Sequence, residues 1–150
     1  ILGVKGPVPL EDYEIGFGHA RVVRPGDHVT VVALARMVHL TLSACQELER
    51  EGISVELIDP RTIVPLDLDA IARSVAKTGR LLVLDEAPAS CGFSAEIAAG
   101  IADLGFNDLD APIRRLTGAF APTPYSPPLE AAIAPGPSAI AQAIRSLVEE

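Results

Sequence analysis

Polar side chains follow the buried, strand-like runs of this sequence, and their types could bind or transform a small molecule. The carboxyl ends of parallel strands meet at one edge of a sheet, where α/β proteins bind their ligands. Arginines there would hold an anion, and carboxylates would serve as acid and base. The strand-end residues are Arg36, Asp59, Arg61, Asp85, Glu86 and Thr117. We expect Arg36, Arg61, Asp85 and Glu86 either to line a strand-end crevice or to cap helices and pair with one another.

The neighbouring carboxylates Asp85 and Glu86 resemble an acid/base or metal-binding pair. Adjacent residues of an extended segment point in opposite directions, however, so we expect no shared proton. Other site motifs are missing, because the sequence contains no strand-following GxGxxG, P-loop, HExxH or GxSxG segment. Cys45 and Cys91 lack CxxC spacing and are expected to be reduced thiols. The motifs thus predict no catalytic, cofactor-binding or metal-binding residue in this chain.

The acidic balance restricts the partners. The 150 residues contain 12 Lys and Arg against 20 Asp and Glu, a formal net charge of −8 with a pI near 4.8. This field repels phosphate backbones, so nucleic acid is not expected to bind, whereas a basic protein surface would associate faster. The sequence shows neither an apolar run of membrane length nor a cleavable leader. We therefore expect a cytoplasmic protein that makes no membrane contact.

Alternating strand and helix patterns must position these residues. Strand patterns cover residues 20–23, 29–34, 55–58, 81–84 and 113–116, the last as an edge strand, and residues 24–27 form a turn. Helical spacing covers residues 37–48, a stretch between an N-cap at Asp67 and Gly79, a third helix from about Ser94 and a last one from Ser138. The third would bury Leu104. Strands separated by helices predict a three-layer α/β/α sandwich.

Residues 122–130, Pro-Thr-Pro-Tyr-Ser-Pro-Pro-Leu-Glu, are the most unusual segment. Proline fixes φ and removes an amide donor, so we expect a stiff surface strap that lies outside helices and strands and leads into a helix at Leu129. Pro124, Tyr125, Pro127 and Pro128 would form an interface with a partner or domain. The open alternative is that this segment is a tethering loop that lies over the protein's own core.

Several short blocks closely resemble the C-terminal domain of transketolase-like enzymes. They are ARMVH at residues 35–39, GI at 52–53, DPRT at 59–62, VPLD at 64–67, KTGR at 77–80, DEAP at 85–88, LDAP at 109–112 and the proline strap. The resemblance runs from about Tyr13 to Leu147. Within this group the chain looks like the β subunit of a thiamine-dependent 2-oxo acid dehydrogenase or of acetoin dehydrogenase, although Cys91-Gly92 replaces the family's frequent Gly-Gly.

This resemblance implies a five-stranded mixed sheet whose first strand is antiparallel at an edge, beside the third strand. The family's complete enzyme is an α2β2 assembly that decarboxylates a 2-oxo acid on thiamine diphosphate and Mg²⁺ and passes the acyl group to a lipoyl arm. Its cofactor lies between the α subunit and the preceding domain of the β subunit. The resemblance therefore implies that this chain, with residues 1–12 as a linker remnant and 13–150 as the domain, holds no cofactor and is inactive alone.

The same resemblance implies protein partners. The domain would contact the α subunit and a second β subunit and would dock the basic subunit-binding domain of the dihydrolipoyl acyltransferase. Asp110, in the LDAP block, matches a docking carboxylate, and Asp108 and Glu150 are further candidates by charge and position. The chain could also form a homodimer. The alternative function is a stand-alone small-molecule-binding α/β domain that uses the strand-end crevice.

Overall fold

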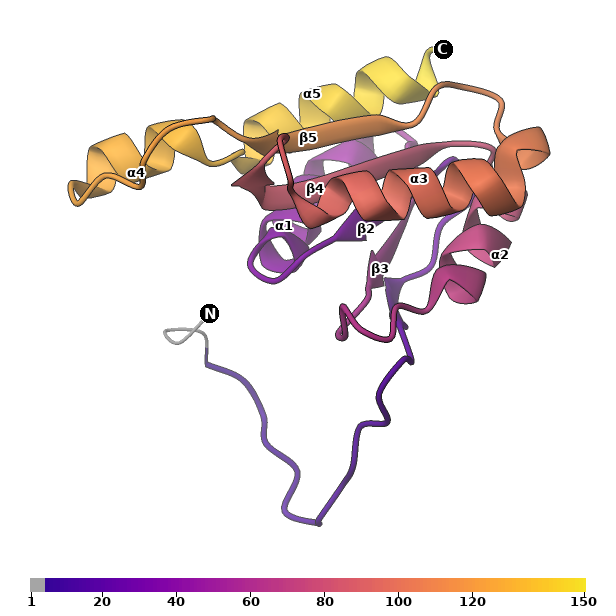
Figure 1. The fold of residues 1–150 in the computed structure, drawn as a ribbon, viewed down its shortest axis with the longest axis horizontal. Helices are drawn as coiled ribbons and strands as arrows, with labels where there is room; N and C mark the ends of the chain where they lie inside the picture. Colours follow the sequence, from indigo (N-terminus) through magenta and orange to yellow (C-terminus); the bar gives the residue numbers. More distant parts are fainter. Residues whose placement is uncertain (1–4) are drawn as a thin grey trace.

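The computed structural model describes residues 5–150, which form one sheet with helices on both of its faces (Figure 1). The strands are β1 (Arg21–Arg24), β2 (Val29–Ala33), β3 (Val55–Asp59), β4 (Leu81–Pro88) and β5 (Arg114–Gly118). The helices are α1 (Met37–Arg50), α2 (Leu68–Thr78), α3 (Phe93–Gly105), the 3-10 turn η1 (Phe106–Asp108), α4 (Pro127–Ile133) and α5 (Pro137–Val148). No helix within this described range combines the length and apolarity that crossing a bilayer requires.

The sheet has the order β1-β3-β2-β4-β5, with β1 antiparallel to β3 and all other pairs parallel. The antiparallel edge strand beside β3 is thus confirmed, as is the edge position of β5. The turn at residues 24–27 joins β1 to β2, which are not sheet neighbours. Because β2, β3, β4 and β5 are parallel, their carboxyl ends share one edge and their amino ends share the opposite edge.

The predicted three-layer sandwich is confirmed. Every residue of β2 is buried, and alternate side chains enter two separate cores. Val29, Val31 and Ala33 pack with α1 and α5 on one face, whereas Val32 packs with α2 and α3 on the other. Such burial on both sides explains the nearly continuous aliphatic runs of the central strands.

Helix α2 begins and ends as the sequence predicts. The Asp67 carboxylate accepts the Ala70 amide at 3.1 Å as an N-cap and also accepts the Ala20 amide at 2.9 Å. Hydrogen bonds from Ala20 and Ala70, despite partial desolvation, hold the pKa of Asp67 below its usual range. Gly79 closes the helix at φ 69°, a left-handed conformation that favours glycine.

Two local predictions are wrong. Leu104 does not lie on the inner face of α3, since its side chain is 59% exposed while Ile97 and Ile101 are buried. Pro127 and Pro128 do not precede a helix but form the first turn of α4. Proline is tolerated there because the first amides of a helix have no intrahelical acceptor. The strap therefore ends at Ser126, two residues earlier than expected.

Residues 119–133, which we call the arm, leave the body after β5 and return before α5. The Ala119 amide donates to the Ile133 carbonyl at 2.8 Å and closes the neck of the arm. Tyr125 is fully exposed, Phe120 and Leu129 are largely exposed, and α4 has no buried residue between Pro127 and Ile133. Figure 1 shows α4 projecting beyond the end of β5. The arm thus does not cover the protein's own core.

The segment before β1 also extends away from the sheet (Figure 1). Residues 5–16 are exposed and contain no helix or strand. The predicted linker comprises residues 1–12, of which residues 1–4 lie outside the described residues.

Candidate functional site

Asp85, one of the four predicted crevice residues, is buried at the carboxyl end of β4. Its side chain is oriented toward α3, where Oδ2 accepts the Ser94 amide at 3.3 Å, while Oδ1 accepts the Ala87 amide at 2.9 Å. The residue is 6% exposed. Asp85 therefore caps the amino end of α3, which has no cap from its own N-cap residue, Gly92.

Glu86 points to the opposite face of the sheet. Its Oε1 accepts the Arg36 amide at 3.3 Å, at the amino end of α1. Because α1 has no acidic residue in its first turn, Glu86 supplies the negative charge that a helix amino terminus favours. The adjacent carboxylates thus diverge to two helices on two faces and share no proton.

Arg61 lies apart from these caps, in an open groove of about 890 Å³ beside the carboxyl end of β3. We call it the strand-end groove. It lies between the segment before β1, β1 itself, the turn after β3 and the first half of α1. Its lining residues are Ile15, Phe17, Arg21, Val23, Leu34, Ala35, Val38, His39, Leu42, Asp59, Pro60, Arg61, Thr62 and Ile63. The lining includes Arg61 but not Arg36, Asp85 or Glu86, so the four predicted residues do not surround one cavity.

The three predicted docking carboxylates lie at the opposite edge of the sheet. Asp108 is exposed in η1, and Asp110 is exposed just before β5. Glu150 comes from the chain end, where its carboxylate pairs with Arg114 of β5. We call this surface of Asp108, Asp110 and Glu150 the docking face, after the role that the sequence analysis predicts for it. Figure 1 shows the chain end and α4 at opposite ends of the molecule, so the docking face is remote from the arm.

An apolar depression that the sequence analysis missed adjoins Asp110. This groove of about 460 Å³, which we call the Phe106 groove, is lined by Ala102, Phe106, Leu109, Asp110, Ala111, Pro112 and Ile113. Phe106 is 72% exposed. Helical spacing alone offered no signal for it, because the depression forms where the end of α3 meets the loop before β5.

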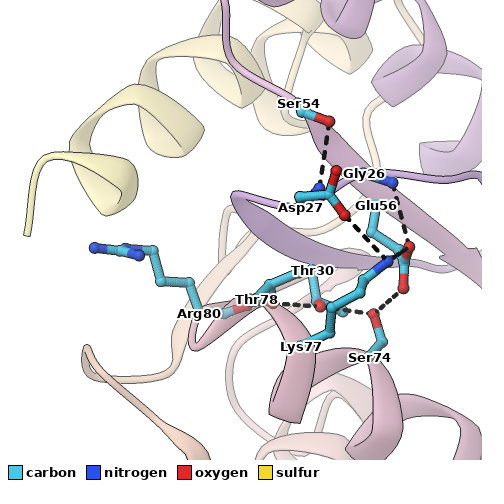
Figure 2. A network of polar contacts seen from close by, with 9 residues as sticks. All are labelled: Gly26, Asp27, Thr30, Ser54, Glu56, Ser74, Lys77, Thr78 and Arg80. Atoms are coloured by element: carbon cyan, nitrogen blue, oxygen red, sulfur yellow. Dashed lines mark hydrogen bonds and ion pairs between the residues drawn. The ribbon is translucent and has the colours of Figure 1, made fainter.

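A polar network joins α2 to strands β2 and β3 (Figure 2). It supports the turn that contacts Asp110. The Asp110 amide donates to the Gly79 carbonyl at 2.7 Å, immediately after α2. Thr78 at the end of α2 hydrogen bonds to Thr30 of β2, and Thr30 hydrogen bonds to Ser74, both at 2.7 Å. These contacts fix the last turn of α2 to the centre of the sheet and thereby position Asp110.

Glu56 of β3 is the charged centre of this network. Its side chain accepts Ser74 Oγ at 2.7 Å and the Gly26 amide at 3.2 Å, and it pairs with Lys77. Since Ser74 donates its single hydroxyl proton to Glu56, Thr30 donates to Ser74. The Thr78 hydroxyl has two acceptors within reach, Thr30 Oγ1 at 2.7 Å and the Arg80 carbonyl at 3.2 Å. Burial, the largest single effect, favours the neutral acid, but the hydrogen bonds that Glu56 accepts and Lys77 together hold the pKa of Glu56 below its usual value.

The described residues offer no cluster of metal ligands. Residues 5–150 contain no group of three His, Cys, Asp or Glu side chains arranged to hold a metal ion. Asp85 and Glu86, the nearest to such a group in the sequence, are occupied by two different helix ends.

The comparisons with known proteins agree with this architecture. The family model "Transketolase, C-terminal domain" matches residues 18–140. The chain belongs to the transketolase C-terminal domain family. The resemblance inferred from the short sequence blocks is thereby confirmed.

Similar curated proteins are beta subunits. The beta subunit of acetoin:2,6-dichlorophenolindophenol oxidoreductase from Bacillus subtilis is 43% identical over 147 residues, covering 98% of this chain and 43% of the relative. The 2-oxoisovalerate dehydrogenase subunit beta of the same organism is 40% identical over 97% of this chain and 45% of the relative. The mitochondrial pyruvate dehydrogenase E1 component subunit beta of Ascaris suum is 37% identical over 97% and 42%. The chain spans less than half the length of these relatives.

A solved structure supports the fold. The structure titled "Split gene transketolase, inactive beta4 tetramer" superposes with a TM-score of 0.74 at 22% identity and covers 92% of this chain and 44% of that chain. At this identity the likeness concerns the transketolase C-terminal domain fold alone, including its mixed five-stranded sheet.

Proposed function

We propose that this chain is the assembly domain of the beta subunit of an enzyme that oxidises a 2-oxo acid or acetoin with thiamine diphosphate bound elsewhere in the complex. The observation that carries the proposal is the end-to-end similarity to beta subunits, at 43% identity over 98% of the chain. The similarity spans acetoin, 2-oxoisovalerate and pyruvate enzymes. The similarity alone therefore does not select one of these substrates.

The docking face would bind the basic subunit-binding domain of the acyltransferase. Asp110 combines an exposed carboxylate with the adjoining Phe106 groove, so charge and apolar area lie side by side. Such a pairing suits a small basic domain, because the groove supplies binding area while the carboxylate orients the partner. Asp108 adds negative charge, whereas Glu150 would have to share its carboxylate with Arg114.

The experiment is a binding measurement between this chain and the basic domain at about 150 mM salt, where remote charges are screened, with Asp110→Lys as the variant. We expect binding to weaken at least about 10-fold, since the substitution places a cation opposite the partner's basic residues. Asp12→Lys, with the same change of charge on the exposed segment before β1, is the matched control and should bind nearly as the wild type does. Unaltered binding of the Asp110→Lys variant would remove the docking role.

The arm would contact the second beta subunit. Phe120, Tyr125 and Leu129 expose aromatic and aliphatic surface on a segment that prolines stiffen, and this reduces the entropy lost on association. Sedimentation velocity over a concentration series tests this role. Self-association should weaken in the Tyr125→Ser, Leu129→Ser double variant and persist in Leu10→Ser, an equally apolar-to-polar change at a fully exposed site. Equal sedimentation of the wild type, the double variant and Leu10→Ser would contradict the role of the arm.

A further inference from the structure

The strand-end groove has the form of a ligand site. Its wall is mostly aliphatic, with Val23, Leu34, Val38 and Leu42 contributed by β1, the end of β2 and α1. Its volume of about 890 Å³ lies within the range of small-molecule pockets, which typically measure roughly 300–1,000 Å³. The groove also lies beside the carboxyl end of parallel strand β3, where α/β sheets place ligands.

Two arginines and a histidine line this groove despite the acidity of the chain. Arg21, His39 and Arg61 all line it. Within residues 5–150, neither arginine takes part in an ion pair, a property they share with Arg36, Arg50, Arg73, Arg80 and Arg115. What distinguishes Arg21 and Arg61 is that both guanidinium groups line one concave surface, where together they can bind an anion.

Asp59 is the single carboxylate in the lining, and it lies opposite Arg21 in the β1–β3 pair. Its Oδ1 accepts the backbone amide of Arg61 at 3.0 Å. The Arg61 side chain is anchored by Nε, which donates to the His19 carbonyl at 2.9 Å. This bond uses one of the five guanidinium donors, so the terminal nitrogens remain available for a bidentate contact.

Backbone strain is concentrated at the same place. Of the three non-glycine residues with positive φ in the described range, Ala35 at 49° and Arg61 at 58° line the groove. The Thr62 hydroxyl holds this turn, donating to the Pro65 carbonyl and accepting the Gly18 amide, both at 2.9 Å. Strained residues persist where surrounding contacts over-determine them, and they cluster at binding sites. Arg61 is thus preorganised.

We propose that the strand-end groove binds an aliphatic carboxylate, with Arg21 and Arg61 holding the carboxylate and the wall of Val23, Leu34, Val38 and Leu42 contacting the hydrocarbon body. This site is separate from the docking face and from the arm, and the proposal does not depend on the assembly function. A carboxylate fits the guanidinium fork, and the apolar wall selects anions that carry a hydrocarbon chain over small inorganic ones.

The test follows backbone amide NMR signals of the chain during titration with octanoate. We expect saturable shifts at residues of the groove, with a dissociation constant on the order of 0.1–1 mM. Shortening the probe from octanoate to butanoate should weaken binding by roughly 2- to 4-fold for each methylene that leaves the wall. Octylamine, which has the same chain and the opposite charge, should not bind.

The variant is the double substitution Arg21→Gln, Arg61→Gln, in which glutamine keeps a donor for the His19 carbonyl but removes the charge. We expect octanoate affinity to fall at least about 10-fold while the thermal unfolding midpoint stays near that of the wild type. Arg50→Gln, at the far end of α1 and outside the groove, is the matched control and should bind octanoate normally.

Three outcomes would overturn the proposal. The first is the absence of groove shifts with octanoate, and the second is octanoate binding by the double variant at wild-type affinity. The third is equal binding of octanoate, octylamine and inorganic phosphate, because the groove would then recognise neither the charge nor the hydrocarbon chain. Since Arg50→Gln also removes a positive charge, a general effect of net charge is distinguished from a site.

Discussion

Cys91 has the third positive φ among the described non-glycine residues, at 58°, and it is exposed in the turn before α3. A side chain in this left-handed conformation costs about 1 kcal/mol, which glycine avoids. We predict that Cys91→Gly raises the free energy of unfolding by about 1 kcal/mol, measured by urea denaturation. Cys91→Ala retains the Cβ and should change stability by less than about 0.5 kcal/mol, and an equal gain in both variants would point to the thiol instead of the backbone.

Glu56 is predicted to make stability depend on pH. Its usual pKa is 4.5, and the fold lowers that value, so below pH 4.5 the unfolded chain binds the proton more readily than the folded chain. Falling pH therefore favours unfolding, and the contribution present above pH 4.5 is lost as the pH falls through the folded pKa. Asp67 and Glu51 act in the same direction.

The test is Glu56→Gln, compared with the wild type in urea at about pH 7 and about pH 4. Glutamine removes the charge that Lys77 faces, so we expect a loss of about 2 kcal/mol at neutral pH and a smaller further loss in acid than the wild type shows. Glu11→Gln, at an exposed position, should keep the wild-type pH dependence. An unchanged acid dependence in Glu56→Gln would show that other carboxylates dominate.

Sequence reasoning identified the polar strand-end residues but not their roles. It predicted that Asp85 and Glu86 diverge, because that follows from the alternation of an extended strand. It left open whether they line a crevice or cap helices, since a cap supplied from another element depends on tertiary packing. The structure resolves this choice for two residues, with Asp85 bound to the Ser94 amide and Glu86 to the Arg36 amide.

At the scale of elements, α2 connects the polar network to the docking face. Its closing residue Gly79 needs glycine twice, because φ is 69° and a Cβ there would lie 2.2 Å from Asp110 Oδ2. Gly52, which follows α1 with φ 79°, has no atom within 4 Å of the position that a Cβ would take and so needs glycine only for its backbone. Comparing the two positions therefore distinguishes the cost of a positive φ, which both share, from the cost of a steric clash, which only Gly79 would add.

We predict that Gly79→Ala lowers the free energy of unfolding by more than the roughly 1 kcal/mol expected for Gly52→Ala. Gly79→Ala should also weaken binding of the basic domain, since its methyl group displaces the Asp110 carboxylate, whereas Gly52→Ala should bind normally. Denaturation and binding measurements on both variants provide the check. If the two variants bound the basic domain equally well, the position of the Asp110 carboxylate would not depend on Gly79, and the prediction would be wrong.

The errors at element scale have a common origin. Periodicity located the buried strands and the faces of α2 and α5, because those elements cover a sheet. It assigned Leu104 to the interior although that side chain is exposed while the neighbouring Gly105 is buried, and it excluded helix at Pro127 although a first turn accepts proline. The Phe106 groove was missed for a related reason, as it exists only where two elements meet.

At the scale of the whole molecule, the parallel strands separate the proposed functions. The strand-end groove and the arm lie at the carboxyl edge of the sheet, whereas the docking face lies at the amino edge. α5 runs back antiparallel to the strands, so the chain ends beside Arg114, where β5 begins. One domain could therefore contact a second subunit at one end and a basic partner at the other without competition.

The net charge of −8 is expected to change the association rate constant for a basic partner more than the dissociation rate constant. We predict that the association rate constant for the basic domain falls about 10-fold or more between about 50 and 500 mM NaCl, while the dissociation rate constant changes less. Stopped-flow mixing measures the first and dilution the second. A salt-independent association rate would contradict steering by the acidic field.

Varying the ionic strength distinguishes the effect of a charge far from the docking face from the effect of a charge within it. The screening length is about 30 Å at 10 mM salt and about 8 Å at 150 mM. Asp12→Lys, far from the docking face, should therefore slow association at about 10 mM salt but have little effect at about 150 mM, whereas Asp110→Lys should slow it at both. Equal association rate constants for both variants at the higher salt concentration would mean that the net charge of the chain sets this rate and that Asp110 makes no specific contribution.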